Sequence, residues 1–260
     1  MEDVNDLRMS AERHEFMVHY QPVFEIPSRR VVGFEALLRW QHPTRGLVMP
    51  LDFIHIAEET GLIIPIGGWI LDQACSQLAV WQQTYPAAAE LVMSVNLSAR
   101  QFADPGPDNM VEEMLIRYHL KPANLALEIT ETALMENMDI ASQMLSNLHD
   151  IGVHIFIDDF GTGYSSLERL QRLPIDTIKI DRSFLQNPEF DNDQGNILRA
   201  FALIGNESGL DVIAEGVDEE PQLQALVRLG IRYSQGFYFS SPAPADEVER
   251  VISRQSSVFS

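Results

Sequence analysis

Two consecutive aspartates, Asp158 and Asp159, follow the apolar run Ile155-Phe156-Ile157 and precede the glycine-containing segment Phe160–Tyr164. Adjacent carboxylates suit a site for two divalent cations, because one carboxylate can bridge both ions while its neighbour binds only the second. Two ions about 4 Å apart can activate a water for in-line attack on phosphorus. Alone, the pair equally suits the start of a turn, since aspartate is common before glycine-rich loops.

Polar residues also stand at or near the ends of other apolar, strand-like runs, where an apolar residue would pack better. These residues are Asn96, Glu128, Lys179, Glu215 and Gln235. Glu35 is likewise a charged residue inside the otherwise apolar run Val31–Leu38. In a barrel the carboxyl ends of the strands meet at one mouth, so residues far apart in the sequence would converge there. Four or more carboxylates aimed at one mouth could not all ionise without cations.

The ligands in this pattern carry oxygen, and the sequence has no cluster of Cys or His with metal-ligand spacing. Oxygen ligands are typical of hard cations such as Mg²⁺ or Mn²⁺ and disfavour Zn²⁺. The residues therefore predict a site for two Mg²⁺ or Mn²⁺ ions that hydrolyses a phosphodiester.

The elements that must position these side chains alternate along the chain from Leu91 onward. Short apolar, β-branched runs alternate with segments whose apolar residues recur at helical spacing, which predicts βαβ units. The candidate strands are Leu91–Val95, Leu125–Ile129, Val153–Ile157, Thr177–Ile180, Asp211–Ala214 and Arg232–Gln235. One helical stripe comprises Leu134, Met138, Ala141, Leu145 and Leu148, with Gly152 as its stop.

The first forty residues follow a different pattern, with strand-like runs at Phe16–Glu25 and Val31–Leu38 separated by only five residues. So short a link favours an antiparallel hairpin over a parallel crossover. Two opening strands and six later ones make eight, which predicts an α/β fold, a modified TIM (β/α)8 barrel with an antiparallel first strand. A doubly wound open sheet is the alternative, but no phosphate-binding G-x-G-x-x-G loop follows a strand. The 260 residues suit a single domain, residues 1–260.

Composition restricts the partners of this chain. The sequence has 18 Lys and Arg against 38 Asp and Glu, a formal net charge of −20. Such a surface would repel a polyanionic duplex, so we expect no binding of duplex nucleic acid. A small phosphate ligand remains compatible with this charge, because bound divalent cations can invert the local potential in an acidic cleft.

Cys75 is the only cysteine, so no disulfide forms within the chain, and its helical setting predicts a buried side chain. No stretch reaches the roughly 18 apolar residues of a transmembrane helix, and the N-terminus has no signal-peptide pattern. We therefore expect no direct membrane insertion and a cytoplasmic location.

Several short motifs, in order, carry a resemblance to a known family. They are Glu35-Ala36-Leu37, Asn96 in Ser94–Ser98, Glu128-Ile129-Thr130-Glu131, Asp158–Leu167, Lys179-Ile180-Asp181 and Ala214–Val217. Together they resemble the EAL-domain cyclic-di-GMP phosphodiesterases, over the region from about residue 20 to residue 242. The resemblance implies a TIM-like barrel that uses Mg²⁺ or Mn²⁺ to hydrolyse cyclic di-GMP to linear pGpG.

The resemblance also assigns roles around the metals. It implies that Glu35, Asn96, Glu128 and Asp158 bind one ion, and that Asp158 bridges to a second. Asp159 would bind the second ion, which Glu215 supports through water. Lys179 matches the family lysine beside the attacking water, where its charge could lower the pKa of that water. Lys179, Glu215 and Asp159 are therefore the expected catalytic residues.

Further roles lie outside the metal ligands. The residues that resemble substrate contacts are Gln21, Leu38, Arg39, Asp181 and Gln235. Arg39 suits bidentate recognition of phosphate. Residues 159–166 match the family loop that links metal binding to dimerisation, and Glu131 matches a glutamate that steadies it. A homodimer through the barrel is implied, whereas His42 is expected in a turn beside the site without a chemical role.

Two other functions compete with an active phosphodiesterase. A catalytically silent receptor for cyclic di-GMP would usually lose metal ligands or degrade the Asp-Asp-Phe-Gly loop, but each of those positions carries the expected residue type here. An enolase-like barrel with one Mg²⁺ and a lysine base would have no need of two adjacent aspartates. The sequence therefore favours hydrolysis.

Overall fold

The computed structural model describes residues 2–102, 107–136, 138–162, 173–186 and 193–256. The barrel strands are β1 (Phe16–Glu25), β2 (Arg30–His42), β4 (Val92–Asn96), β5 (Leu125–Thr130), β6 (His154–Phe160), β7 (Thr177–Ile180), β8 (Asp211–Ala214) and β9 (Tyr233–Ser234). They pair in the order β1, β9, β8, β7, β6, β5, β4, β2, and β2 pairs back with β1 to close the ring. The eight-stranded barrel expected from the sequence is confirmed, and the open sheet is wrong.

The direction of the strands follows from the opening hairpin. β1 is antiparallel to both of its neighbours, β2 and β9, and the remaining barrel pairs are parallel. β2 is longer than predicted, because its end pairs with β3 (Gly46–Val48) in a second hairpin with His42 opposite Gly46. The expectation that His42 lies in a turn is therefore wrong, since His42 is the last residue of β2.

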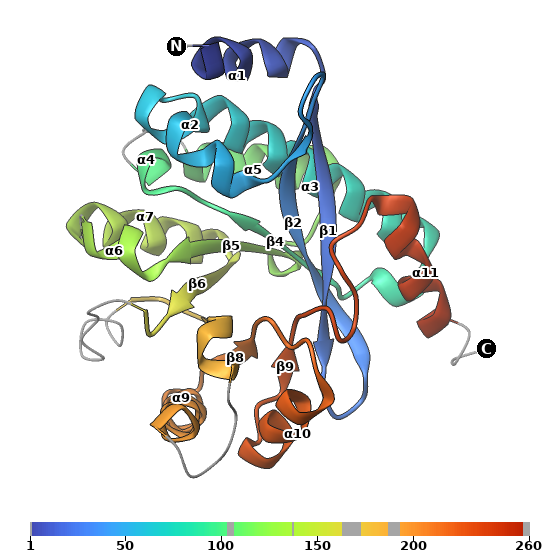
Figure 1. Cartoon of the computed structure of the whole chain (residues 1–260), viewed down its shortest axis with the longest axis vertical. Coiled ribbons are helices and arrows are strands. Elements are labelled where there is room, and N and C mark those ends of the chain that lie inside the picture. The colour runs from blue at the N-terminus through green and yellow to red at the C-terminus, as the bar shows by residue number, and fades with distance from the viewer. Residues whose placement is uncertain (1, 103–106, 137, 163–172, 187–192, 257–260) are drawn as a thin grey trace.

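Helices surround the barrel (Figure 1). They are α1 (Glu2–Glu12), α2 (Ile54–Thr60), α3 (Ile63–Thr84), α4 (Ala99–Phe102), α5 (Pro107–Tyr118), α6 (Glu131–Glu136), α7 (Met138–Ile151), α9 (Asp193–Ser208), α10 (Glu220–Leu229) and α11 (Ala245–Ser256). Short 3₁₀ turns are η1 (Pro50–Asp52), η2 (Pro86–Ala88), η3 (Pro122–Asn124) and η4 (Arg182–Leu185). β4 and β5 lead into α4 and α6, on the left of Figure 1, which marks the side where the strands end.

The predicted helical stripe from Leu134 to Leu148 is divided between α6 and α7. Leu134 of α6 and Leu145 and Leu148 of α7 are buried, as the spacing predicts. Gly152 ends α7 with a φ of 95°, and its N–H donates to the carbonyl of Leu148. Glycine reaches this left-handed conformation at little cost, so its role as a helix stop is confirmed.

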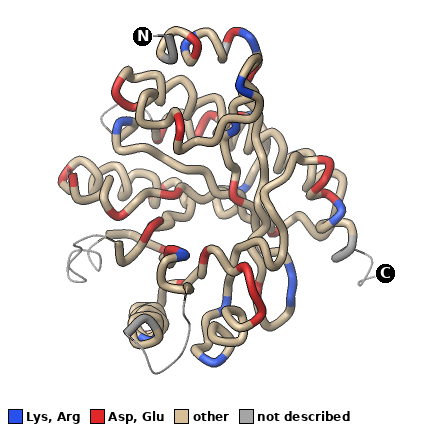
Figure 2. The backbone as a smooth tube through the Cα atoms, in the orientation of Figure 1, with Lys and Arg blue, Asp and Glu red and all other residues tan. Residues whose placement is uncertain are grey.

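Cys75 is fully buried in α3 as a free thiol, as predicted. Burial raises the pKa of this thiol to about 12, so the group is an unreactive part of the core. Among the described residues, no helix is both long enough and apolar enough to cross a membrane. Acidic positions occur on most of the helices around the barrel (Figure 2), in keeping with the net charge of −20.

The close approach of β2 and β4 depends on a glycine. Gly33 lies opposite Val92 in the parallel pair, two residues before Glu35. A Cβ atom on Gly33 would lie 2.5 Å from the carbonyl oxygen of Val92, which is backbone and cannot move independently of its strand. Only glycine therefore lets the two strands pair at this point.

Gly33→Ala is expected to lower the free energy of unfolding by roughly 1–3 kcal/mol, because the added methyl overpacks a strand contact. Urea unfolding followed by circular dichroism measures the loss. Gly68→Ala is the matched control: its Cβ would meet only the flexible side chain of Met110, at 3.2 Å, and alanine favours a helix. Equal midpoints for the two variants would contradict this account of Gly33.

Candidate metal and catalytic site

The polar residues predicted at the strand ends converge inside the mouth of the barrel. Side chains alternate along a strand, so residues two apart on one strand face the same side. The residues that meet at the mouth are Glu35 of β2, Asn96 of β4, Glu128 of β5, Asp158 of β6, Lys179 of β7, Glu215 just after β8 and Gln235 just after β9. Seven segments thus contribute one side chain each.

Lys179 lies at the centre of this group, and only 1% of its side chain is exposed. Its Nζ lies 2.6 Å from a carboxylate oxygen of Glu128 and 2.7 Å from one of Glu215. Glu35 and Asp158 follow at 3.3 and 3.6 Å. Four carboxylates from four different strands or strand ends therefore surround one ammonium.

Glu35 is held in place by two amides. Asn96 Nδ2 donates to Glu35 Oε1 at 2.9 Å, and Gln235 Nε2 donates to Glu35 Oε2 at 2.7 Å. Gln235 Nε2 also lies 2.8 Å from Gln21 Oε1, while Gln235 Oε1 is buried and has no hydrogen-bond partner among the described residues. The amides fix the orientation of Glu35 and leave one buried acceptor at the site.

Asp158 and Asp159 lie side by side because the end of β6 departs from regular strand geometry. Alternation would send neighbouring side chains to opposite faces of a strand. The register with β7 shifts between Ile157 and Phe160, and Asp159 has a φ of 54°, in the left-handed region. Carboxylate oxygens of Asp158, Asp159 and Glu215 consequently lie within 4.8 Å of one another and could hold a metal ion.

The donor set fits divalent cations. Five carboxylates, from Glu35, Glu128, Asp158, Asp159 and Glu215, surround the single ammonium of Lys179. Full ionisation would leave four negative charges without a partner, which two divalent ions would balance. All of these ligands offer oxygen, the preference of Mg²⁺ and Mn²⁺.

The excess negative charge is reflected in the pKa values. Burial, and then repulsion from Glu35, raises the pKa of Glu128 well above its ordinary value. Burial raises the pKa of Glu215 to about 8. The positive charge of Lys179 lowers this pKa, and the negative charge of Asp158 raises it further. Burial and the charge of Asp158 also raise the pKa of Asp159. At neutral pH the Glu215 carboxyl therefore keeps a proton that a cation would displace.

A cleft of about 640 Å³ opens beside the acidic residues. Its walls include Glu35, Asn96, Asp158 and Asp159, together with Leu38 from β2. A cavity of this size lies within the 300–1,000 Å³ typical of small-molecule sites. The charged group therefore faces a space large enough for a nucleotide ligand.

Two residues expected to contact substrate are buried near the cleft without lining it. Arg39 donates from Nη1 to the carbonyl of Leu38 at 2.8 Å, and burial lowers the pKa of its guanidinium. Gln21 is joined to the group through Gln235, and its own Nε2 donates to the carbonyl of Ser240 at 3.3 Å. Arg39 thus contacts the backbone of the cleft residue Leu38, and Gln21 is linked to Glu35 through Gln235.

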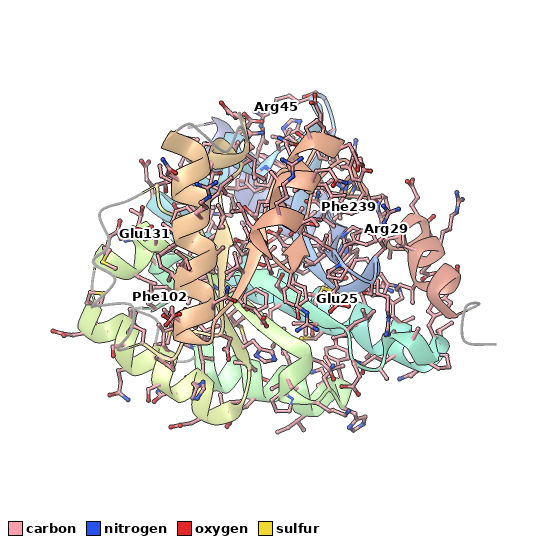
Figure 3. The ribbon with its side chains drawn as sticks, turned by 90° about the horizontal axis from the view of Figure 1, so that it is seen from below. Glu25, Arg29, Arg45, Phe102, Glu131 and Phe239 are labelled. Carbon is pink, nitrogen blue, oxygen red and sulfur yellow. The ribbon has the colours of Figure 1, made fainter. Side chains whose placement is uncertain are left out.

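Glu131 begins α6 and is labelled in Figure 3. Its carboxylate accepts a hydrogen bond from the N–H of Gly161 at 2.8 Å, and only 1% of the residue is exposed. This bond anchors the backbone just after Asp159. Of the predicted loop 159–166, residues 163–166 lie outside the described residues.

Asp181 is an N-terminal cap, because its carboxylate accepts the N–H of Ser183 at the start of η4. The negative charge of Asp181 helps to raise the pKa of Asp159, because the two carboxylates repel each other. His42 is buried away from the acidic group: its Nδ1 accepts the N–H of Thr44 at 3.2 Å, and its Nε2 lies 3.6 Å from Asp6.

Three charged residues of the cleft wall were missed from the sequence: Glu58, Arg100 and Glu136. Glu58 of α2 lines the cleft, and its Oε1 accepts the hydroxyl of Ser98 at 2.7 Å. For Glu58 the only available signal was its position beside a second acidic residue, Glu59, on the same helix, which is also typical of a solvated helix face.

Comparison with known proteins agrees with this geometry. The EAL domain matches residues 4–242. A bifunctional diguanylate cyclase/cyclic di-GMP phosphodiesterase, MucR of Pseudomonas aeruginosa, is 44% identical over 94% of the chain and 36% of its own length. The cyclic di-GMP phosphodiesterase PdeR of Escherichia coli is 38% identical over 96% of the chain and 37% of its own length. The present chain thus spans about a third of the length of these relatives.

A solved structure described as the PaMucR phosphodiesterase in complex with c-di-GMP superimposes on the chain with a TM-score of 0.91. It is 43% identical and covers 95% of this chain and 100% of its own. The similarity between the two structures therefore extends over the whole barrel and its surrounding helices.

The raised pKa of Glu215 predicts how the metal-free chain responds to pH. A carboxyl with a higher pKa in the folded state binds more protons when folded, so stability falls as pH rises from about 4.5 toward 8. The slope is at most about 1.4 kcal/mol per pH unit for one such group. Urea midpoints measured with EDTA between pH 5 and 8 should fall, and Glu215→Gln should flatten the fall. Identical slopes for wild type and variant would contradict this assignment.

Proposed function

The chain belongs to the EAL domain family, and we propose that it is a metal-dependent phosphodiesterase that hydrolyses cyclic di-GMP to linear pGpG. The observation that carries this proposal is the acidic group around Lys179, beside a cleft of about 640 Å³ at the carboxyl ends of the strands. Relatives at 38–44% identity are named as phosphodiesterases of cyclic di-GMP, which supports the choice of substrate.

We assign the metal ligands on the arrangement of oxygen donors. Glu35, Asn96, Glu128 and Asp158 would hold one ion, and Asp158 and Asp159 would hold a second, with Glu215 in support. The proximity of the carboxylates of Asp158, Asp159 and Glu215 supports the second position. When bound, two Mg²⁺ or Mn²⁺ ions supply Lewis acidity at the phosphate oxygens and acidify the attacking water.

Lys179 has two tasks in this mechanism. Its ammonium holds Glu128 and Glu215 at hydrogen-bonding distance and so keeps their oxygens in place for the cations. In this proposal its positive charge also stabilises the negative charge that develops on a phosphate oxygen during attack. A lysine with almost no exposure loses little free energy in reorganisation, because its partners already fix it.

We propose that the dinucleotide occupies the cleft beside the metals. Leu38 offers an apolar wall, while Arg39 and Gln21 act on the phosphate side, with Gln235 and Asp181 nearby. The unpaired Oε1 of buried Gln235 supports its role, since a donor from the ligand or from an ordered water would satisfy it. Glu131 steadies the backbone after Asp159 through Gly161.

We further propose that residues 1–260 form one domain that pairs as a homodimer through the barrel and works in the cytoplasm. The complete coverage of the PaMucR phosphodiesterase chain supports a single domain. The single buried cysteine, as a free thiol, is compatible with a reducing compartment. Light scattering after gel filtration measures the mass of the particle in solution and tests the dimer.

The direct test of hydrolysis is incubation of the purified chain with cyclic di-GMP and either Mg²⁺ or Mn²⁺, followed by chromatography of the products. We expect pGpG with metal and none with EDTA. Asp159→Asn should lower the rate by two orders of magnitude or more, because it removes a charged ligand of the second ion while the fold stays intact.

Asp150→Asn, the same chemical change at an exposed position of α7, is the control and should keep the wild-type rate. Wild-type turnover by Asp159→Asn would exclude its metal role. Tight binding of cyclic di-GMP without product under either metal would instead favour a silent receptor.

A further inference from the structure

The segment that follows β4 is tied to the end of α2 at the wall of the acidic cleft. Ser98, two residues after Asn96, donates its hydroxyl to Glu58 Oε1 at 2.7 Å. Two residues further on, Arg100 Nη2 donates to the backbone carbonyl of Glu59 at 3.3 Å, so α2 and α4 lie next to each other (Figure 1). Glu58, Ser98 and Asn96 all line the cleft. A single hydrogen bond therefore links Glu58 to the strand end that carries Asn96.

Ser98 caps the start of α4 through both its side chain and its backbone. Its Oγ accepts the N–H of Arg100 at 3.2 Å, and its own N–H donates to Oε1 of Gln101 at 3.0 Å. This reciprocal pair is a capping box, which satisfies N–H groups that the start of a helix leaves without partners. Because α4 has only four residues, it is too short to be stable as an isolated helix, and its position depends on these contacts.

Gln101 is itself fixed against α3. Only 4% of Gln101 is exposed, and a Cβ atom on Gly67 of α3 would lie 2.2 Å from its Nε2. The side chain of Gln101 thus occupies the space that the missing side chain of Gly67 leaves. The N–H of Ser98 is consequently bonded to a group that packing already holds in place.

Glu58 determines the direction of the Ser98 hydroxyl proton, which the capping box leaves open. The oxygen of that hydroxyl accepts from Arg100, so its proton needs a separate acceptor. Glu58 provides this acceptor at a distance typical of a strong hydrogen bond to a carboxylate. Without Glu58 the hydroxyl could turn toward water, and the link between α2 and this segment would lose its shorter bond.

Asn96 depends on this segment because its side chain is exposed at the cleft, where packing does not fix it. Its Nδ2 donates to Glu35, and the next residue, Leu97, donates its N–H to the carbonyl of Glu128 at 2.8 Å. A functional side chain must be held within about 0.5 Å of its working position. The backbone from Asn96 to Ser98 therefore determines where the amide of Asn96 is presented.

We propose that Glu58 is a positioning residue for the metal site, which orients Ser98 and through it holds Asn96 where its amide oxygen can bind a cation. The inference rests on the proposed function, in which Asn96 is a ligand of the first ion. Glu58 acts through Ser98 and not as a ligand, so its effect depends on the hydrogen bond and not on its charge. A glutamine at this position keeps an acceptor oxygen and therefore replaces it.

Titration of MnCl₂ into the purified full chain, measured by calorimetry without nucleotide, tests this role. Glu58→Ala and Ser98→Ala should each weaken Mn²⁺ binding about tenfold, the lower end of the range for residues that support a metal ligand. Glu58→Gln should bind Mn²⁺ nearly as wild type does, because its amide oxygen still accepts the hydroxyl. In a chain that already carries Asn96→Ala, adding Glu58→Ala should cause no further loss, since the ligand that Glu58 positions is gone.

Glu59→Ala is the matched control. It removes the same charge from the next residue of α2, where the side chain is exposed and the backbone carbonyl still accepts Arg100. Glu59→Ala should bind Mn²⁺ as wild type does. Circular dichroism of each variant at the titration temperature shows whether it is folded.

Three results would overturn the positioning role. They are wild-type affinity in Glu58→Ala, equal losses in Glu58→Ala and Glu58→Gln, and a further loss of similar size when Glu58→Ala is added to Asn96→Ala. A wild-type chain that binds no Mn²⁺ would overturn both this role and the metal site. Because no nucleotide enters the titration, a wild-type chain that binds Mn²⁺ and makes no pGpG would overturn the proposed hydrolysis alone.

Discussion

Burial of the Lys179 ammonium among carboxylates is the interaction on which the mouth of the barrel depends. A buried charge is stable only with close partners of opposite sign, and Glu128 and Glu215 supply them at 2.6 and 2.7 Å. Because each partner belongs to a different strand or strand end, the ion pairs tie β5 and β7 to the segment after β8. The carboxylates outnumber the ammonium, and the resulting excess of negative charge allows the mouth of the barrel to bind cations.

A local departure from strand geometry completes the site. Regular alternation would place Asp158 and Asp159 on opposite faces of β6, where they could not act on one cluster of ions. The left-handed backbone of Asp159 brings both carboxylates to one side, and aspartate tolerates this conformation better than most residues. Glu131 holds the next segment through Gly161, so the unusual backbone is supported from a neighbouring helix.

The same alternation divides the barrel interior into two levels. Polar residues fill the level at the carboxyl ends of the strands, while small and apolar residues such as Gly33 and Ile213 line the level beneath. Gly33 is needed for the strands to pair, and its missing side chain also leaves room in a cavity at this lower level. The absence of a side chain at Gly33 therefore lets β2, which carries Glu35, pair with β4, and it also leaves space beneath Glu35.

Local patterns in the sequence predicted the barrel strands, the opening hairpin and the polar residues that meet at the mouth. Thr177–Ile180 and Asp211–Ala214 were predicted with the observed bounds, because their apolar runs and punctuation are local signals. The three-residue β3 was not predicted, since its pairing depends on a distant partner. Only the tertiary structure decided that Lys179 lies at the centre of four carboxylates and that Asp159 turns inward. Both depend on contacts between strands far apart in the chain, which no local pattern contains.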